Sequence, residues 1–241
     1  MFKLTKLKMA TSGQKSLRKY LLYAFGEIIL IVFSLLMALQ INSLNEERKK
    51  NNRLDVYKNL LAQDLTEDLI AIEKTKNQFE KELKSLNTLK HRLNNPDATL
   101  DTVYYIAKNE FSPSIPPFVN YNRGTFDALK ASGDIGLLDQ LLVSKLSNLI
   151  ELQEEQKFYS ELTIQSHGNI LEDYVKSFAL YKGVIEAGPV YEKIWGNTNK
   201  VELAVKLNAL LTLKLSALSN AINYYEKIEV KTEPIISDLQ N

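Results

Sequence analysis

Residues 20–42 read YLLYAFGEIILIVFSLLMALQIN, an almost entirely apolar stretch whose only acidic or basic side chain is Glu27. A helix of this length covers roughly 30 Å, the thickness of the hydrocarbon core of a bilayer. A cleaved signal peptide would have a shorter apolar run that ends in an Ala-x-Ala-like site. Residues 38–40 match such a site poorly, and the helix-forming NEERKK follows shortly after them. The stretch therefore predicts an uncleaved transmembrane helix.

The charges that flank this helix predict its orientation. Residues 1–19 contain six basic residues and no acid, whereas basic residues alternate with Glu46, Glu47 and Asp55 after the helix. Short loops rich in Lys and Arg stay in the cytoplasm. We therefore expect residues 1–19 to be a basic tail on the cytoplasmic side of the inner membrane. Residues 43–241 are then expected in the periplasm.

Glu27 shares one face of the predicted helix with small and polar residues. Spacings of three and four residues place on this face Ala24, Glu27, Ile31, Ser34 and Ala38. Small residues let two membrane helices approach closely, and polar residues hydrogen-bond between them. An acid within a span often marks a functional site. We expect this face to contact another span. The alternatives are an isolated acid that reaches the headgroups and a residue of an ion pathway.

Residues 23–28, YAFGEI, and residues 38–46, ALQINSLNE, carry a resemblance. They are similar to the Y-A-x-G-E-I and A-L-x-I-N-x-x-N-E segments of an uncharacterised bacterial family of single-span membrane proteins, frequent in Bacteroidota. Residues 125–138, TFDALKASGDIGLL, resemble a further segment of that family. Leu44 departs from it, because the family has an aromatic residue there. The resemblance implies a membrane-bound helical protein with a domain of unknown function, and it supplies no catalytic residues.

The composition excludes several classes of function. Lys and Arg nearly balance Asp and Glu, 30 against 29, so no global charge attracts nucleic acid. The chain contains no cysteine, which excludes disulfides, thiolate chemistry and cysteine metal sites. Its 9 glycines and 6 prolines are few and clustered, which is typical of a protein built from long helices.

The pattern of residues 43–241 predicts a helical bundle. Residues 43–94 lack glycine and proline, and apolar residues recur there every seven positions from Leu65 to Leu93. Further long helices are expected over residues 137–180 and 200–230, with a break between them at 181–199. Short helices are expected over residues 100–109 and over 126–131, the second with Thr125 as its cap. We therefore predict an all-α protein, in which a transmembrane helix precedes an antiparallel bundle of three long helices plus short helices.

The sequence shows no pattern for catalysis or for binding a metal or cofactor. His91 and His167 have no partner at metal-site spacing, so we expect both on the surface. The acidic clusters at residues 64–68 and 151–155 are interpreted as solvated faces. Residues 131–136, ASGDIG, lack the phosphate-loop pattern and indicate the end of a helix. We expect a protein that is not an enzyme.

The proline-rich stretch FSPSIPPFVNYNRGTF, residues 111–126, predicts a stiff, extended loop. Aromatic residues and arginine are frequent at protein interfaces. The loop is therefore a candidate partner-binding segment, and the residues that would make the contact are Phe118, Tyr121, Arg123 and Phe126. The alternative is that the same aromatics close one end of the bundle.

These patterns favour a membrane-anchored structural or interaction protein. It would oligomerise or dock a partner membrane protein, and it would not bind nucleic acid. A periplasmic ligand-sensing module that signals through a partner protein is the second hypothesis. A stator-like subunit that uses Glu27 in an ion pathway is the third.

Overall fold

The computed structural model describes the backbone of residues 4–240 and the side chains of residues 21–240. The described backbone forms six α-helices and one short 3-10 helix, η1 (Asp134–Leu137), and it contains no strand, so the predicted all-α fold is confirmed. The chain divides into two compact units, Met1–Val56 and Tyr57–Asn241. Helix α1 (Leu4–Leu93) supplies residues to both units. The boundary at residues 42/43, predicted from the end of the apolar run, stays a prediction.

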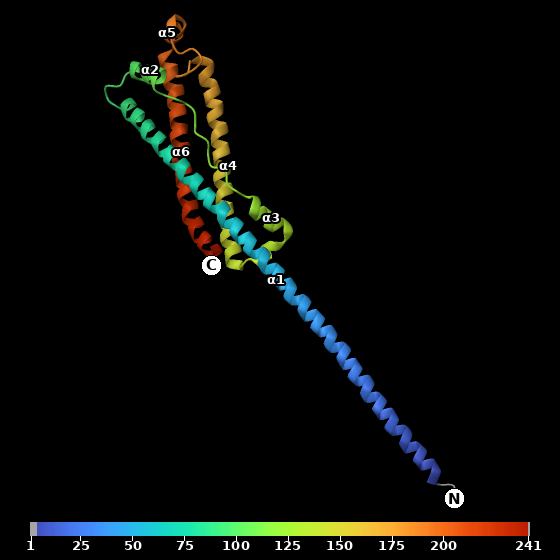
Figure 1. Cartoon of the computed structure of the whole chain (residues 1–241). Helices are drawn as coiled ribbons and strands as arrows, with labels where there is room; N and C mark the ends of the chain where they lie inside the picture. The colour runs from blue at the N-terminus through green and yellow to red at the C-terminus, as the bar shows by residue number, and fades with distance from the viewer. Residues whose placement is uncertain (1–3, 241) are drawn as a thin grey trace. The chain divides into compact units, whose positions relative to one another are not determined.

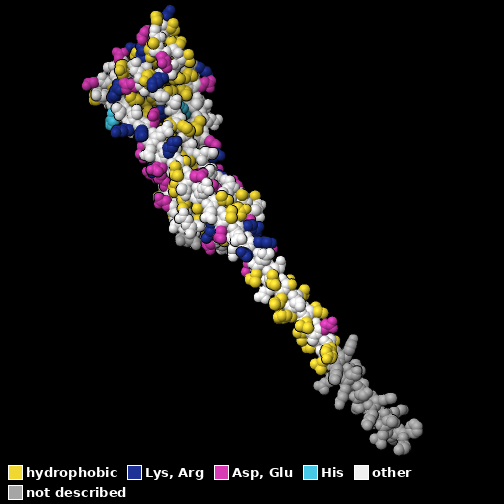
Figure 2. Space-filling view, viewed as in Figure 1, with side chains coloured by type: hydrophobic (Ala, Val, Ile, Leu, Met, Phe, Trp, Pro, Cys, Tyr) yellow, Lys and Arg dark blue, Asp and Glu magenta, His cyan; other side chains and the backbone are white. Residues whose placement is uncertain are grey.

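The first unit contains the apolar segment. It is long and apolar enough to cross a membrane, and none of its most apolar part is buried within the protein. The large apolar side chains between Leu21 and Leu44 are all exposed, and Figure 2 shows them as hydrophobic atoms that cover this part of the helix. A soluble protein rarely exposes a continuous apolar surface of this length, so the expected membrane-spanning helix is supported. The side chains of the predicted tail, residues 1–19, lie outside the described residues.

The second unit is built around three long helices: the later part of α1, α4 (Gln140–Ser177) and α6 (Lys200–Gln240). The short helices are α2 (Leu100–Asn109), α3 (Gly124–Ser132) and α5 (Gly188–Gly196). Helix α6 runs antiparallel to the other two (Figure 1). Ion pairs agree with these directions, because partners with higher residue numbers on α1 or α4 pair with lower residue numbers on α6. The pairs between α4 and α6 are Lys145–Asp238 and Lys206–Asp173, and those between α1 and α6 are Lys76–Glu229 and Lys214–Glu82.

Helices α1 and α4 run in the same direction because residues 110–123, the crossover segment, carry the chain back along the bundle (Figure 1). Phe118 packs edge-on against Phe79 of α1, with the ring centroids 5.4 Å apart. The backbone N–H of Val119 donates to the hydroxyl of Tyr225 on α6 at 3.0 Å. Prolines 113, 116 and 117 favour the extended backbone and bring no N–H group that needs a partner. The predicted stiff loop is therefore a packed fourth element of the bundle.

The core follows the apolar repeat that the sequence predicts. Leu65, Ile72, Phe79 and Leu86 are all buried on one face of α1, because a spacing of seven residues is close to two helical turns. Helix α6 also has a buried row, which includes Leu207, Leu218, Ile228 and Ile235. Phe79 of α1 lies against Tyr225 of α6, with the ring centroids 6.1 Å apart. Burial of these side chains is the main source of stability for the second unit.

Several predicted helix ends hold and others are wrong. Thr99 caps α2, with its side chain accepting from the N–H of Asp101, and Gly133 ends α3 with a φ of 77° that favours glycine. Thr125 is not the cap of α3, since that helix begins at Gly124 and its N-cap makes no side-chain bond. Helix α4 begins at Gln140 rather than 137, because Asp139 accepts from the N–H groups of its first turn.

The C-terminal third of the chain is more helical than its glycine and proline content indicates. The expected break at residues 181–199 contains α5, which has Pro189 in its first turn. Proline is tolerated there because the N–H groups of the first turn form no hydrogen bond within the helix. Trp195 of α5 is buried. Helix α6 continues to Gln240 through Pro234 instead of ending near residue 230. The free energy gained by burial of Ile235 and Leu239 offsets the loss of the backbone hydrogen bond that the proline cannot form.

Candidate functional site

Polar side chains line part of the core of the second unit. Helix α4 contributes Gln153, Gln156, Ser160 and His167, which share one face because they are three, four and seven residues apart. Helix α6 contributes Lys214. The prediction of a surface position is confirmed for His91 and wrong for His167, whose side chain is only 5% exposed. Helices α4 and α6 pack against each other, and this packing buries the face of α4 that carries His167.

Asp68 of α1 fixes the lower end of the crossover segment. Its carboxylate accepts hydrogen bonds from the backbone N–H and the side-chain amide of Asn122, at 2.9 and 3.0 Å, and from Gln153 at 3.3 Å. The interpretation of a solvated acidic face is therefore wrong for Asp68, which is 1% exposed. Burial raises its pKa to about 6, since the charged form loses water, although the bond from the Asn122 N–H opposes this rise.

Lys214 of α6 holds the upper end of the same segment. Its ammonium group donates to Glu82 of α1 at 2.5 Å and to the backbone carbonyl of Ser112 at 2.8 Å. Burial and the charge of Lys214 lower the pKa of His167, which favours the neutral imidazole. Its Nε2 atom is buried and has no hydrogen-bond partner within the described part of the chain.

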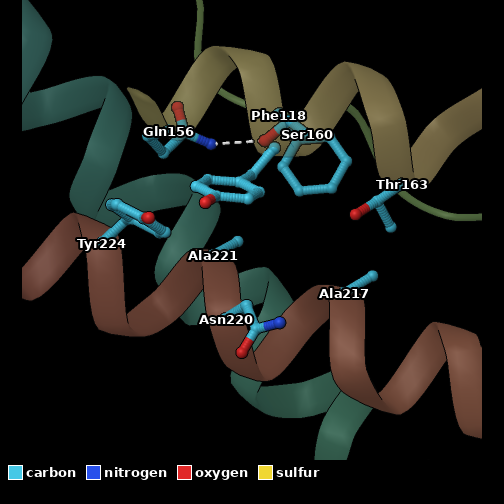
Figure 3. Close-up of a pocket in the computed structure, with 9 residues that line it drawn as sticks. Phe118, Gln156, Ser160, Thr163, Ala217, Asn220, Ala221 and Tyr224 are labelled. Carbon is cyan, nitrogen blue, oxygen red and sulfur yellow. Dashed lines mark hydrogen bonds between the residues drawn. The ribbon is translucent and has the colours of Figure 1, made fainter. Parts of the chain in front are cut away.

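A cavity of about 250 Å³ lies between α4 and α6 beside this polar face (Figure 3). Tyr121 of the crossover segment donates from its hydroxyl to Gln156 Oε1 at 3.0 Å, and Gln156 Nε2 donates to Ser160 Oγ at 2.6 Å. Phe118 closes one side of the cavity. The complete lining is Phe118, Gln156, Tyr159, Ser160, Thr163, Ala217, Asn220, Ala221 and Tyr224.

The four residues of the candidate partner-binding loop lie mostly against the bundle. Tyr121 and Phe126 are buried, and Phe118 is half-buried between Phe79 and the cavity. The guanidinium of Arg123 donates to Glu154 of α4 at 2.6 Å. The aromatics thus pack along the bundle rather than close one end of it, and a role in binding a partner stays a prediction.

The predicted contact face of the membrane segment is continuous on α1. Glu27, Ile31, Ser34 and Ala38 line one shallow hollow of the helix surface. Ser34 donates to the carbonyl of Leu30 at 2.8 Å, so its hydroxyl is satisfied within the helix. Ala24 lies one turn before Glu27 on the same face. This face therefore combines small side chains with one carboxylate.

Residues 21–240 contain no group of three or more His, Asp or Glu that could hold a metal ion. The polar face of α4 is the feature that sequence reasoning missed. Its signal was present, because Gln153 and Gln156 continue the spacing of the buried residues Leu142, Leu146 and Leu149.

Comparison with known proteins assigns a family. The sequence model of a family described as a family of unknown function (DUF6090) matches residues 27–217. The chain belongs to the DUF6090 family. The match begins at Glu27 in the apolar segment, and it includes the crossover segment, all of α4 and the first part of α6. The expected membership of a family without an assigned function is confirmed. No curated protein and no solved structure matches the chain.

Proposed function

We propose that this chain is a non-enzymatic interaction protein anchored in the inner membrane of a bacterium. Residues 20–42 span the membrane, residues 1–19 remain in the cytoplasm, and the helical bundle lies in the periplasm. The anchor binds a second span, supplied by another copy of the chain or by a partner membrane protein. The bundle is thereby held beside that partner.

The exposed contact face of the apolar segment carries this proposal. Glu27 lies about 10 Å inside the expected cytoplasmic edge of the span, since it is seven residues beyond Tyr20. A carboxylate that faces lipid there costs on the order of 1–3 kcal/mol. Against another helix it gains a hydrogen-bond partner, a contribution of about 1 kcal/mol. Ala24 and Ala38 allow the close approach that such a bond requires.

The contacts of the buried ionisable groups support a role without catalysis. Asp68 and Lys214 each bind the crossover segment and a neighbouring helix, so their hydrogen-bonding capacity is used by the fold. Catalytic acids and bases need access to a substrate. In this bundle the two groups instead determine the path of the chain.

Substitution of Glu27 tests the proposal. Glu27→Leu should leave the protein in the membrane but weaken its association with other spans, because the hydrogen-bonding group is lost. Glu27→Gln should retain most of the association, since an amide still hydrogen-bonds. Gln40→Leu is the matched control, because it replaces a polar side chain by leucine on the opposite face of the same helix. Association is measured from detergent-resistant complexes after mild extraction.

The outcomes separate the hypotheses for Glu27. Loss of association in Glu27→Leu but not in Gln40→Leu supports the contact face. If no substitution changes association, Glu27 is an acid that the membrane tolerates and the proposal is wrong. If both Glu27 variants lose biological activity while association is intact, the charge itself matters, and the ion-pathway hypothesis replaces the contact.

A further inference from the structure

We propose that the cavity between α4 and α6 is a binding site for a small, neutral molecule that contains one ring and an amide or hydroxyl group. This inference goes beyond the proposed docking function and does not depend on it. The two sites belong to different units of the chain, so each can be tested while the other is unchanged.

The size of the cavity sets the size of the ligand. Its volume is about 250 Å³. An engineered apolar protein cavity of about 150 Å³ holds benzene. The extra space admits one or two substituents on a single ring, and it is too small for two fused rings that carry side groups. The cavity is partly open to solvent, so a ligand can enter without unfolding of the bundle.

The walls of the cavity differ in chemistry, as a bound ring with a polar substituent requires. Phe118 and Tyr159 supply aromatic surface, against which a flat ring packs well. Gln156, Ser160 and Thr163 of α4 and Asn220 of α6 supply amides and hydroxyls (Figure 3). Ligand sites in proteins commonly combine apolar surface with a few polar groups that fix orientation.

The charge of the lining selects a neutral ligand. None of the residues that line the cavity is Lys, Arg, Asp, Glu or His. A charged ligand that left water would therefore find no compensating charge in the wall. Two charged residues contact the lining residue Tyr224: the carboxylate of Glu155 accepts a hydrogen bond from its hydroxyl at 2.9 Å, and the ammonium of Lys227 lies 5.4 Å from the centre of its ring. Neither residue lines the cavity.

Several polar groups of the wall keep hydrogen-bonding capacity for a ligand. Ser160 Oγ accepts from Gln156, so its own O–H remains able to donate. Thr163 forms no hydrogen bond through its side chain with any described residue, and its hydroxyl faces the cavity in Figure 3. Ser160 is nine-tenths buried, which makes its hydroxyl part of a formed site rather than of the open surface.

Occupation of this site would act on the crossover segment. Gln156 joins the cavity wall to Tyr121, and Phe118 belongs to both the segment and the wall. A ligand that binds one arrangement of these residues more tightly shifts the bundle toward that arrangement. The site would therefore give the bundle the internal element that a ligand-sensing module needs.

Three molecules of one shape test the inference on the full chain in lipid nanodiscs: benzamide, benzoate and benzamidine. They share a ring and a planar substituent but carry no charge, a negative charge and a positive charge, respectively. Saturation-transfer NMR should detect binding of benzamide alone, with a dissociation constant on the order of 1 mM, as expected for a ligand of this size. Empty nanodiscs correct for partition into lipid.

Variants locate the binding. Thr163→Val keeps the shape of the wall and removes one hydroxyl, so the affinity for benzamide should fall about three- to tenfold. Thr212→Val is the matched control, because Thr212 is exposed on α6, does not line the cavity and bonds only the carbonyl of Asn208. Ala221→Leu should abolish binding by filling the cavity, and its helical spectrum shows whether the bundle still folds.

The proposal is overturned if benzamide fails to bind at about ten times the expected constant, where a site of this kind would be mostly occupied. It is also overturned if the charged analogues bind as well as benzamide, or if Thr163→Val and Thr212→Val bind it equally. None of these results bears on association through the membrane segment, which Glu27→Leu measures separately.

Discussion

Lys214 on α6 and Glu82 on α1 form an ion pair with a distance of 2.5 Å between Nζ and Oε1, and the lysine is only 1% exposed. The same ammonium group donates to the Ser112 carbonyl, so one charge joins two helices and the crossover segment. The carboxylate of Asp68 makes the corresponding contacts with Asn122 at the lower end. These two charged groups fix the segment that allows α1 and α4 to run parallel.

Removal of Glu82 should destabilise the bundle strongly. Glu82→Ala leaves the Lys214 charge buried with only one acceptor, and we expect a loss of about 3 kcal/mol in the free energy of unfolding. Lys214→Met should cost less, because the charge that remains on Glu82 is partly exposed to water. Urea unfolding, followed by circular dichroism, measures both.

An exposed ion pair of the same type provides the control. Glu172 and Lys176 pair across one turn of α4 with most of both side chains in solvent. Glu172→Ala should therefore leave the midpoint of urea unfolding almost unchanged, because solvent screens an exposed ion pair. Equal effects of Glu82→Ala and Glu172→Ala would show that the buried pair is not a stabilising contact.

Asp68→Asn should remove the loss of stability that the natural chain undergoes as the pH rises from about 4 to 6. The raised pKa means that the folded state keeps the proton between about pH 4 and 6, where the unfolded state has lost it. Stability from this group is thus greatest in acid and is lost as the pH rises to about 6. A pKa difference of one unit corresponds to at most about 1.4 kcal/mol, so the difference in the free energy of unfolding between the variant and the natural chain should increase as the pH rises from about 4 to 6.

The pH dependence of the difference between Asp68→Asn and the natural chain is the decisive quantity for this prediction. It should grow between pH 4 and 6 and then stay constant. His167 acts in the opposite direction, because its lowered pKa makes the folded state less stable as the pH falls below 6.5, but this contribution is common to both proteins and cancels. A difference that does not vary between pH 4 and 8 would refute a raised pKa for Asp68.

The bundle should fold without the membrane segment. A fragment of residues 46–241 should be soluble, predominantly helical and cooperative in thermal unfolding, since the apolar rows of α1, α4 and α6 are buried within the second unit. Circular dichroism and size-exclusion chromatography check this. An aggregated or unfolded fragment would mean that the bundle needs a membrane or a partner for its stability.

The basic residues before the apolar segment predict the orientation of the chain. Alkaline phosphatase fused after Asn241 should be active, because the positive-inside rule leaves residues 1–19 in the cytoplasm and the C-terminus outside it. A fluorescent protein that matures only in the cytoplasm should remain dark at the same position. A bright reporter together with an inactive phosphatase would show that the orientation is the opposite of the predicted one.

Local signals in the sequence were sufficient for much of the fold. Helix α2 has the predicted bounds, Leu100–Asn109, because its Thr99 cap acts within one turn. Gly133 ends α3 for a similarly local reason, since its positive φ favours glycine. The seven-residue repeat of α1 likewise predicts its buried face, as Phe79 shows.

Features that depend on contacts between distant segments could not be predicted. Asp68 and His167 are buried because the crossover segment and α6 cover them. The sequence of a single helix does not show which distant segment will pack on it. The continuation of α6 through Pro234 depends on burial of Ile235 beyond it. The walls of the cavity come from three segments: the crossover segment, α4 and α6. The spacing along α4 alone indicates that its polar residues lie on the buried face, but it does not predict a cavity.

A photo-crosslinking comparison tests the central claim most directly, that one face of the membrane segment contacts another span. Ile31 lies on that face and Ile29 on the opposite one, so replacing each in turn by benzoyl-phenylalanine changes the same residue type at similar depth. Illumination of intact membranes should give covalent adducts of the chain with another protein, or with a second copy, from position 31 and few from position 29. Equal yields at the two positions, or a higher yield at position 29, would contradict the account.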